Sequence, residues 1–336
     1  MRDEAEHKGD SEADGLGARR CRDAEGVSSR PRVFGSRRFP ERVRAELERS
    51  FELDVHDSLS PPSRDELLAR AVGKDGLMLM LTDRVDDELL DAAGPQLRIV
   101  ADYAVGIDNI DLDACRRRGV VVSNTPDVLT ETTAELTIAI LLALLRRIAE
   151  GDRLIRRGEQ WIWAPNLMLG RGLAGLVLGL VGHGRIGQAV ERLAHAHGME
   201  VVNHSRTSGI SLDELLAAAD VVSLHLPLTK ESHHLIDAAA LERMKPTAVL
   251  VNVSRGPIVD EEALVAALAE GRIAGAALDV FEREPEVHPG LLGLENVVLV
   301  PHLGSATLAT REAMGMLCVD ALRAVLLEDR VPANAV

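Results

Sequence analysis

Short apolar runs alternate with amphipathic stretches along most of the chain, beginning after Pro31. Apolar runs such as "RVFGS", "GLMLML" and "LRIVADY" are each followed by a helical pattern such as "PERVRAELERS", "DDELLDAAG" or "DLDACRRRG". Strands that alternate with amphipathic helices form right-handed βαβ units, which build a parallel sheet with helices on both faces. The pattern therefore predicts one doubly wound α/β domain over residues 31–125.

A second region of the same kind follows. A long helical pattern runs from about Thr130 to Arg157, and strand and helix patterns then alternate again from "GLVLGLVG" to "NVVLVPH". This predicts a second doubly wound domain over 126–308. The last helical pattern, "TREAMGMLCVDALRAVLLED", has no strand of its own to cover. We expect it to pack on the first domain, which then consists of 31–125 plus 309–336.

Length and composition agree with two globular domains. A chain of 336 residues exceeds the size at which one hydrophobic core keeps growing. Its net charge of −15 argues against nucleic acid or an anionic membrane surface as a partner, because both are bound through clustered positive charge. The longest apolar run, Leu136 to Leu145, is too short to span a bilayer.

The termini and cysteines point to the cytoplasm. Residues 1–30 are highly charged and lack the apolar segment of a secretory signal, so we expect either a disordered N-terminal extension or a start site placed too early. Cys21, Cys115 and Cys318 lie far apart and show no C-x-x-C spacing. They suggest neither a disulfide framework nor a zinc site, and no metal is expected.

A glycine-rich loop opens the second domain. "GLVGHGRIGQAV" places Gly182, Gly184 and Gly187 in a G-x-G-x-x-G pattern between a strand and a helix, which is the context that a dinucleotide-binding loop requires. The glycines would allow a tight turn, close approach of the pyrophosphate and close helix packing. The alternative is a glycine-rich turn that binds no ligand.

The end of the next strand indicates which dinucleotide is bound. An acidic residue there favours NAD, but the chain has Ser205, Arg206 and Thr207. Hydroxyls can donate hydrogen bonds to a 2′-phosphate, and arginine adds a charge-assisted contact. We therefore predict a preference for NADP over NAD, the alternative being that Arg206 is an ordinary solvated side chain.

Unusual polar residues follow three later strands. Arg255 lies in "VNVSRGPIVD", Asp279 and Glu284 lie in "GAALDVFEREP", and His302 lies in "PHLGSAT". Ligands bind beyond the carboxyl ends of parallel strands, so these side chains can converge. Arg255 can hold a carboxylate, His302 can pass a proton to a ketone oxygen, and Glu284 can orient the imidazole and favour its charged form. Taken singly, each could equally be a structural or surface residue.

Together these motifs resemble the D-isomer-specific 2-hydroxyacid dehydrogenases. The resemblance covers about Pro31 to Arg330 and rests, in order, on "YAVGIDNID", "NTPDVLTETTAE", "GHGRIGQAV", "VNVSRGPIVDEEAL", "GAALDVFEREP" and "PHLGSAT". Within that family, "MLTDRVD", "WAPNLMLG" and "NHSRT" look most like the glyoxylate/hydroxypyruvate reductases. The resemblance implies a discontinuous flavodoxin-like substrate domain with an inserted Rossmann domain.

The resemblance also implies an activity and site residues. A hydride passes from the nicotinamide to a 2-oxo carbon, so that a D-2-hydroxy acid forms. Arg255 would bind and polarise the substrate, Glu284 would support the histidine, His302 would be the general acid/base, and Asp279 would orient the nicotinamide carboxamide. Further cofactor contacts would come from Thr133, Arg185, Ile186, Val253 and Gly304, and further substrate contacts from Leu81, Val105 and Gly106.

The family further implies a homodimer, built through the long helix and the arm that carries Trp161 and Trp163. An aromatic side chain of that arm reaches the neighbouring subunit's site in related reductases, but packing is an equal explanation for Trp163. Two other functions stay open. One is a different D-2-hydroxyacid dehydrogenase that uses NAD, and the other is a nucleotide-sensing, corepressor-like binding protein.

Overall fold

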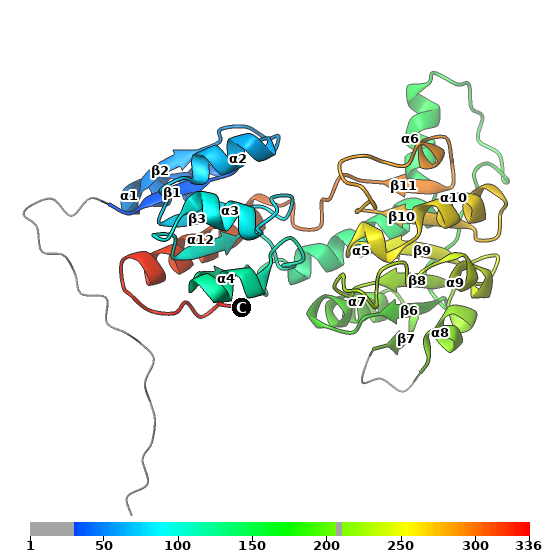
Figure 1. Cartoon of the computed structure of the whole chain (residues 1–336). Helices are drawn as coiled ribbons and strands as arrows, with labels where there is room; N and C mark the ends of the chain where they lie inside the picture. The colour runs from blue at the N-terminus through cyan, green and yellow to red at the C-terminus, as the bar shows by residue number, and fades with distance from the viewer. Residues whose placement is uncertain (1–29, 206–209) are drawn as a thin grey trace, which may run out of the picture. The chain divides into compact units, whose positions relative to one another are not determined.

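The computed structural model describes residues 30–205 and 210–336, and in these residues the chain forms two parallel sheets (Figure 1). The first sheet has the strand order β2-β1-β3-β4-β5, which is the flavodoxin-like order. Its strands are β1 (Arg32–Gly35), β2 (Glu52–Val55), β3 (Gly76–Leu79), β4 (Ile99–Asp102) and β5 (Val121–Ser123).

The helices around this sheet begin where the sequence supplies capping side chains. Ser63, Asp86 and Asp111 each accept a hydrogen bond from a backbone N–H three residues further on, which satisfies one of the free donors at a helix start. The central strands β3 and β4 are buried along their whole length, as expected for a sheet covered on both faces. The helices between these strands are α1 (Glu41–Ser50), α2 (Arg64–Ala71), α3 (Asp87–Ala93) and α4 (Leu112–Arg118).

The last helix of the chain, α12 (Leu308–Leu326), packs on this first sheet. Met314, Cys318 and Leu322 of α12 lie in one buried cluster with Val43 of α1 and Ile99 of β4. The N- and C-terminal parts of the chain therefore share a core.

The second sheet has the strand order β11-β10-β9-β8-β6-β7. Strand β7, which follows β6 in sequence, lies on one side of β6, and β8 lies on its other side. Such a reversal of strand order leaves a crevice at the carboxyl ends of β6 and β8, where ligands bind in such sheets. The strands are β6 (Val177–Val181), β7 (Glu200–His204), β8 (Val221–Leu224), β9 (Val249–Asn252), β10 (Gly275–Leu278) and β11 (Val297–Leu299). The helical segments are α5 (Thr130–Leu145), α6 (Ile148–Arg156), α7 (Arg185–Ala196), α8 (Leu212–Ala218), α9 (Ala238–Arg243), the 3₁₀ turn η1 (Gly256–Ile258), α10 (Glu261–Ala269) and α11 (Pro289–Leu292).

These two sheets confirm the predicted fold class, but the expectation of one continuous helix over 130–157 is wrong. Helix α5 ends at Leu145, and α6 starts after Arg147, whose φ of 54° is left-handed. The N–H of Arg171 donates to the carbonyl of Leu145 at 2.9 Å, and Gly170 packs so closely that a Cβ would lie 2.4 Å from that oxygen. A long-range contact therefore ends the helix where the sequence pattern continues.

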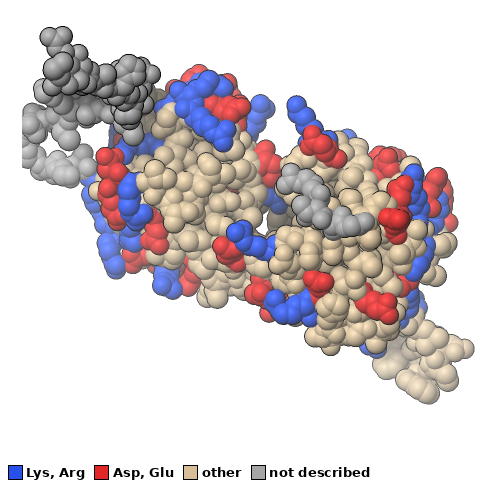
Figure 2. All heavy atoms as spheres, turned by 90° about the horizontal axis from the view of Figure 1, so that it is seen from below, with Lys and Arg blue, Asp and Glu red and all other residues tan. Residues whose placement is uncertain are grey.

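Charged side chains are intermixed on the face of the molecule that Figure 2 draws. Many of them form ion pairs with neighbours, such as Arg44 with Glu48 on α1 and Arg156 with Asp152 on α6. Each exposed pair of this kind contributes only about 0–1 kcal/mol to stability, so these pairs affect solubility more than the fold.

Candidate active site

A cavity of about 1150 Å³ contains the residues that the sequence predicts for catalysis, Arg255, Glu284 and His302. Its lining comes from the ends of strands in both sheets and from the loops that follow them, and its volume is ample for a cofactor together with a small substrate. Other predicted site residues in the lining are Leu81, Val105, Gly106, Thr133, Ile186, Val253, Asp279 and Gly304.

His302 and Glu284 form a pair in this cavity. Nδ1 of the imidazole lies 3.0 Å from Oε2 of the carboxylate, and the second carboxylate oxygen accepts the N–H of Phe281 at 3.1 Å. Burial alone would raise the pKa of Glu284, but the hydrogen bond and charge of His302, with the Phe281 N–H and the charge of Arg255, lower it below its usual value. Glu284 is therefore an anion that holds the imidazole of His302 by Nδ1.

The loop that carries His302 is held by Asp279, at the end of β10. Its carboxylate accepts the N–H groups of Leu303 and Gly304, the latter at 2.9 Å, and its carbonyl accepts the N–H of His302, also at 2.9 Å. The φ of His302 is 54°, a left-handed conformation that few residues other than glycine adopt. Asp279 thus fixes the backbone on which His302 stands. Burial, its largest influence, raises the pKa of this carboxyl group.

Arg255 lies three residues beyond β9 and is fixed by contacts on two sides. Its Nε donates to Oδ1 of Asp108 at 3.0 Å, and one terminal nitrogen donates to the carbonyl of Ser254 at 2.9 Å. The other terminal nitrogen packs against Gly106, where a Cβ would lie only 1.9 Å from it. The guanidinium is therefore held against the backbone segment that the sequence predicts for the substrate carboxylate.

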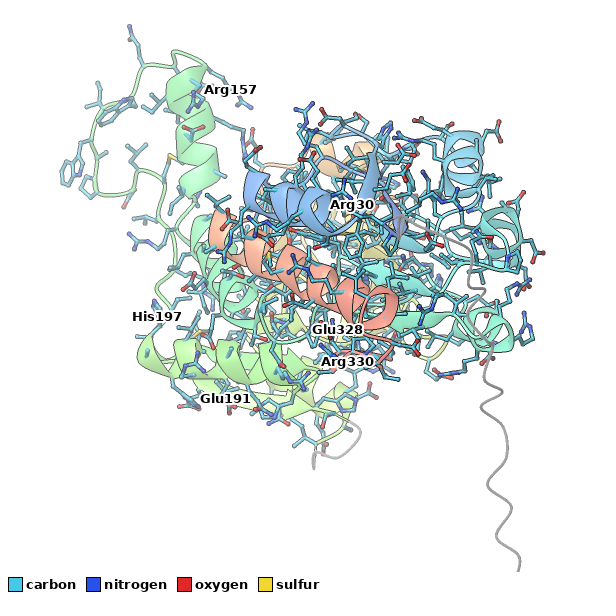
Figure 3. All side chains as sticks on the ribbon, turned by 90° about the vertical axis from the view of Figure 1, so that its left-hand side faces the viewer. Arg30, Arg157, Glu191, His197, Glu328 and Arg330 are labelled. Atoms are coloured by element: carbon cyan, nitrogen blue, oxygen red, sulfur yellow. The ribbon has the colours of Figure 1, made fainter. Side chains whose placement is uncertain are left out.

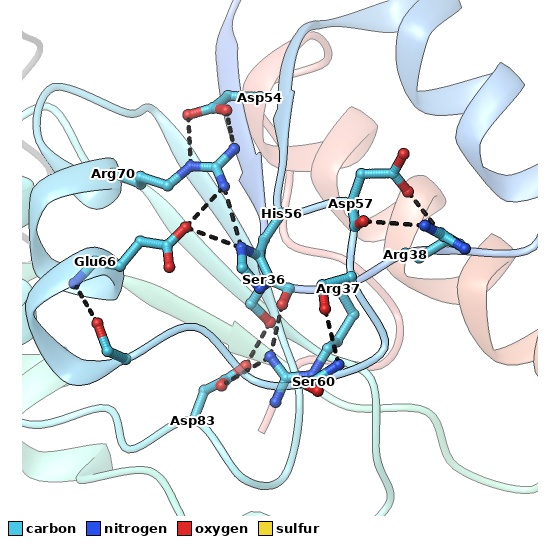
Figure 4. A network of polar contacts seen from close by, with 12 residues as sticks. Ser36, Arg37, Arg38, Asp54, His56, Asp57, Ser60, Glu66, Arg70 and Asp83 are labelled. Atoms are coloured by element: carbon cyan, nitrogen blue, oxygen red, sulfur yellow. Dashed lines mark hydrogen bonds and ion pairs between the residues drawn. The ribbon is translucent and has the colours of Figure 1, made fainter.

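Leu81 lies in a short loop after β3 that a buried polar network holds in place (Figure 4). Asp83 accepts hydrogen bonds from the hydroxyl of Ser36 and, at 2.8 Å, from the N–H of Met80. Arg37 pairs with the same carboxylate at 3.4 Å and donates to Thr82 Oγ1 at 2.7 Å. Arg37 also lines the cavity. Its positive charge is balanced by the carboxylate of Asp83.

A second histidine, His225 at the end of β8, also lines the cavity. Its Nε2 lies 2.8 Å from the hydroxyl of Ser223, and burial lowers its pKa to about 3. His225 is therefore neutral near pH 7, and among the described residues it has no carboxylate partner of the kind that His302 has in Glu284.

The glycine loop fits a dinucleotide. Gly182 has φ 94°, and a Cβ on it would meet the backbone of His225 at 2.7 Å, while a Cβ on Gly187 would lie 2.5 Å from the carbonyl oxygen of Gly182. In the described residues, nothing lies within 4 Å of a Cβ built on Gly184, and no side chain caps the start of α7. The first N–H groups of α7 are thus open to an anion, as pyrophosphate binding requires.

The other residues that the sequence predicts for cofactor binding differ in where they lie relative to the cavity. Thr133 donates to the carbonyl of Gly304 at 3.1 Å, which joins α5 to the His302 loop. Arg185 is largely exposed and pairs with Asp127 at 2.7 Å rather than lining the cavity. Ser205 follows β7, and the predicted Arg206 and Thr207 lie outside the described residues.

The sequence reasoning did not single out Asp108, Arg37 or His225. Asp108 was visible in the motif "YAVGIDNID", and its acidic side chain two residues after Gly106 is a signal that could have been matched to Arg255. No comparable local signal marks Arg37, because it contacts Asp83 from a distant part of the chain.

No group of three or more His, Cys, Asp or Glu side chains in the part of the chain that the structure describes is arranged to hold a metal ion. Helices long and apolar enough to cross a bilayer are likewise absent from these residues.

The chain is similar to known proteins over most of its length. The family model for the D-isomer specific 2-hydroxyacid dehydrogenase, NAD binding domain, matches residues 138–304. The chain is 45% identical to the glyoxylate reductase of Thermococcus litoralis over 323 residues, which cover 91% of this chain and 97% of that protein. It is 47% identical to the glyoxylate reductase of Aeropyrum pernix over 325 residues, which cover 91% and 96%.

Solved structures show the same architecture. A Thermus thermophilus protein matches with a TM-score of 0.86 and 48% identity, covering 91% of this chain and 99% of that one. The NADPH-dependent glyoxylate/hydroxypyruvate reductase of Sinorhizobium meliloti, solved with NADP and malonate, matches with a TM-score of 0.78 and 35% identity, covering 92% and 97%.

The two sheets, the glycine loop and the relatives define an oxidoreductase that depends on a nicotinamide dinucleotide. The chain belongs to the family of D-isomer-specific 2-hydroxyacid dehydrogenases, as its sequence motifs indicated.

Proposed function

We propose that this protein reduces small 2-oxo acids, glyoxylate and hydroxypyruvate first among them, to D-2-hydroxy acids, with NADPH as the preferred reductant. The observation that carries the proposal is the His302–Glu284 pair in one cavity with Arg255. The name glyoxylate reductase, printed for relatives that are 45% and 47% identical, supports the choice of substrate.

The chain's own residues would divide the work as follows. Arg255 and the backbone of Val105 and Gly106 hold the substrate carboxylate, so that the keto oxygen faces His302. His302 donates the proton from Nε2 as negative charge develops on that oxygen, and Glu284 stabilises the imidazolium before the transfer. A dinucleotide held by Gly182, Gly184 and the start of α7 would supply the hydride.

The preference for NADP rests on the residues after β7. Ser205, Arg206 and Thr207 offer hydroxyls and a positive charge where an acidic side chain would repel a 2′-phosphate. The Sinorhizobium meliloti relative, whose description names NADPH and NADP, supports this choice.

A panel of 2-oxo acids assayed with NADPH and with NADH tests the proposal. Glyoxylate and hydroxypyruvate should give the highest kcat/KM, and NADPH should be preferred. A clear preference for NADH would contradict the cofactor assignment alone, whereas a lack of turnover with every 2-oxo acid would contradict the reaction.

The role of His302 is tested by His302→Asn, because asparagine tolerates the left-handed φ at this position better than most residues do. The loss of the proton donor should lower kcat by about 10²–10⁴-fold. The matched control is His197→Ala, at the exposed end of α7 (Figure 3), which should leave kcat unchanged. A loss below about tenfold in His302→Asn would contradict general acid/base catalysis by His302.

We also infer that the protein is a homodimer. Helix α6 and the arm after Arg157, the residue labelled in Figure 3, expose several large apolar side chains. Ile155 is 56% exposed, Ile162 is 85% exposed and Trp163 is 76% exposed. A second copy of the chain would cover them, because large exposed apolar patches mark interaction surfaces. Whether Trp163 reaches the partner's site stays a prediction.

A further inference from the structure

Asp102, the last residue of β4, is a buried acid that the proposed chemistry does not use. Its side chain has no solvent exposure, and neither carboxyl oxygen has a hydrogen-bond partner within 30–205 and 210–336. It directly precedes Tyr103, Ala104, Val105 and Gly106, which line the cavity. A buried carboxylate without a partner is strongly unfavourable, so the acid needs either a donor or a proton.

The side chain of Asn109 lies beside this carboxyl group, and its other hydrogen bonds indicate whether Asp102 has a donor or a proton. The Nδ2 of Asn109 donates to the carbonyl of Met80 at 3.2 Å and to the carbonyl of Asp83 at 3.0 Å, which uses both amide hydrogens. Its Oδ1 is buried and receives no hydrogen bond in the described part of the chain. The amide cannot be reversed without setting its oxygen against both carbonyls, so only Oδ1 is left to face Asp102.

Two acceptors that face each other repel unless one of them carries a proton. We propose that Asp102 is a neutral carboxylic acid that donates its O–H to Oδ1 of Asn109, and so ties β4 to the loops that hold the substrate carboxylate. Through Asn109 this bond reaches Met80 and Asp83, which flank Leu81. Asp102 is thus a positioning residue for the proposed 2-oxo acid site, on whose function this inference rests.

The surroundings favour the neutral form. Burial, the largest influence, raises the pKa of Asp102 to about 8 from its usual value of 3.8, and it outweighs the side chain of Asn109, which lowers the pKa. From α12, the thiol of Cys318 donates to the backbone carbonyl of Asp102 at 3.5 Å and does not reach the carboxyl group. The charged groups that act on the carboxyl are Arg255, which favours the anion, and Asp108 and Asp83, which oppose it.

Loss of the proton should therefore weaken substrate binding at alkaline pH. The ionised carboxylate of Asp102 would repel Oδ1 of Asn109. It would also add a negative charge behind the backbone segment that holds the substrate carboxylate. KM for the 2-oxo acid should rise, whereas kcat should change little from this cause. The structure thus separates a binding effect from a proton-transfer effect.

The variant Asp102→Asn tests this directly. An asparagine N–H can donate to Oδ1 of Asn109 at every pH, so the hydrogen bond should persist without titrating. The ratio of kcat/KM for glyoxylate, variant over parent, should be near one at neutral pH and rise on the order of tenfold well above pH 8, because a buried hydrogen bond is lost only in the parent. Effects of pH on the rest of the site cancel in this ratio, since both proteins share every other residue.

The matched variant Asn109→Leu removes the acceptor instead. Its KM should be raised at every pH, with kcat less affected. A ratio for Asp102→Asn that stays flat from neutral to alkaline pH would overturn the proposal, and so would an unchanged KM in Asn109→Leu.

Two measurements test the same bond without any turnover. The infrared difference spectrum of the full-length protein against Asp102→Asn should show the C=O stretch of a protonated carboxylic acid at pH 7, and lose it above about pH 8. Between the unfolded and native pKa values only the native state holds this proton, so the stability of the parent relative to the variant should fall as pH rises from about 4 to about 8 and then level off. If both signatures are absent, the proposal fails even if glyoxylate is reduced; if both are present without turnover, the proposed function fails and the hydrogen bond stands.

Discussion

Arg255 owes its position to a residue that has no side chain. A Cβ on Gly106 would lie 1.9 Å from the terminal nitrogen of Arg255 and 2.8 Å from Oδ1 of Asp108. The guanidinium can approach the backbone at residue 106 this closely only because that residue is glycine. The sequence motif shows a glycine at that position, but the contact that requires it comes from a strand end almost 150 residues later.

The substitution Gly106→Ala should therefore affect binding more than folding. The clash falls on the free end of a flexible side chain, so stability should change little, but Arg255 would move away from its place. We expect kcat/KM for glyoxylate to fall by about ten- to a hundredfold, the scale of effect that a displacement of about 1 Å produces. Steady-state kinetics together with thermal unfolding check this expectation.

Gly172→Ala is the matched control, because a Cβ there would meet no described atom within 4 Å. Its kinetics and stability should match those of the parent. Equal losses in the two variants would mean that the contact with Arg255 does not matter.

At the scale of elements, α12 belongs to the core of the first sheet although it follows the whole second sheet in sequence. Its contact with α1 is unusually close at Gly315, where a Cβ would lie 2.4 Å from Cγ2 of Val43. Replacing glycine by alanine inside a helix normally stabilises by about 1 kcal/mol. Here the stiff, β-branched side chain of Val43 should reverse that sign.

We therefore expect Gly315→Ala to destabilise the protein by about 1–3 kcal/mol through overpacking. Val43→Ala removes the methyl groups that clash, so the double variant should be more stable than the sum of the two single effects predicts. Chemical denaturation of the four proteins gives the coupling. Strict additivity, or stabilisation by Gly315→Ala alone, would contradict close packing of α12 on α1.

At the scale of the whole molecule, the exposed apolar side chains of α6 and the arm are the feature that a single chain leaves unexplained. Ile155 is 56% exposed and Ile162 is 85% exposed. Polar side chains, which are common in this sequence, would suit a solvated surface better. The proposed homodimer would account for them, because a second copy of the chain would cover these side chains.

A glutamate at either position should prevent assembly. Ile155→Glu and Ile162→Glu would bury an unpaired charge in the interface, so sedimentation or light scattering should give a monomer mass where the parent gives a dimer. Val72→Glu, at a 60% exposed position after α2, is the control and should remain dimeric. A monomeric parent protein would refute the inference.

The sequence alone determined the strands, the glycine loop and the identity of the polar residues at strand ends. Each of these is encoded locally: alternation of apolar and polar positions defines the elements, and parallel strands bring their carboxyl ends to one edge. This is why Arg255, Glu284 and His302 could be predicted to converge, and all three line one cavity. The division of α5 from α6 was missed, because the contact of Arg171 with Leu145 that ends α5 is not local.

Only the tertiary structure decided how these residues are held and which of them are charged. The ion pair of Arg255 with Asp108, the left-handed backbone of His302 and the buried acid Asp102 all depend on segments that meet after folding. Burial removes water from a side chain and leaves its partners to determine its protonation, and burial is a property of the packed molecule rather than of the residue. The sequence therefore names the chemical groups, and the fold determines their geometry and charge.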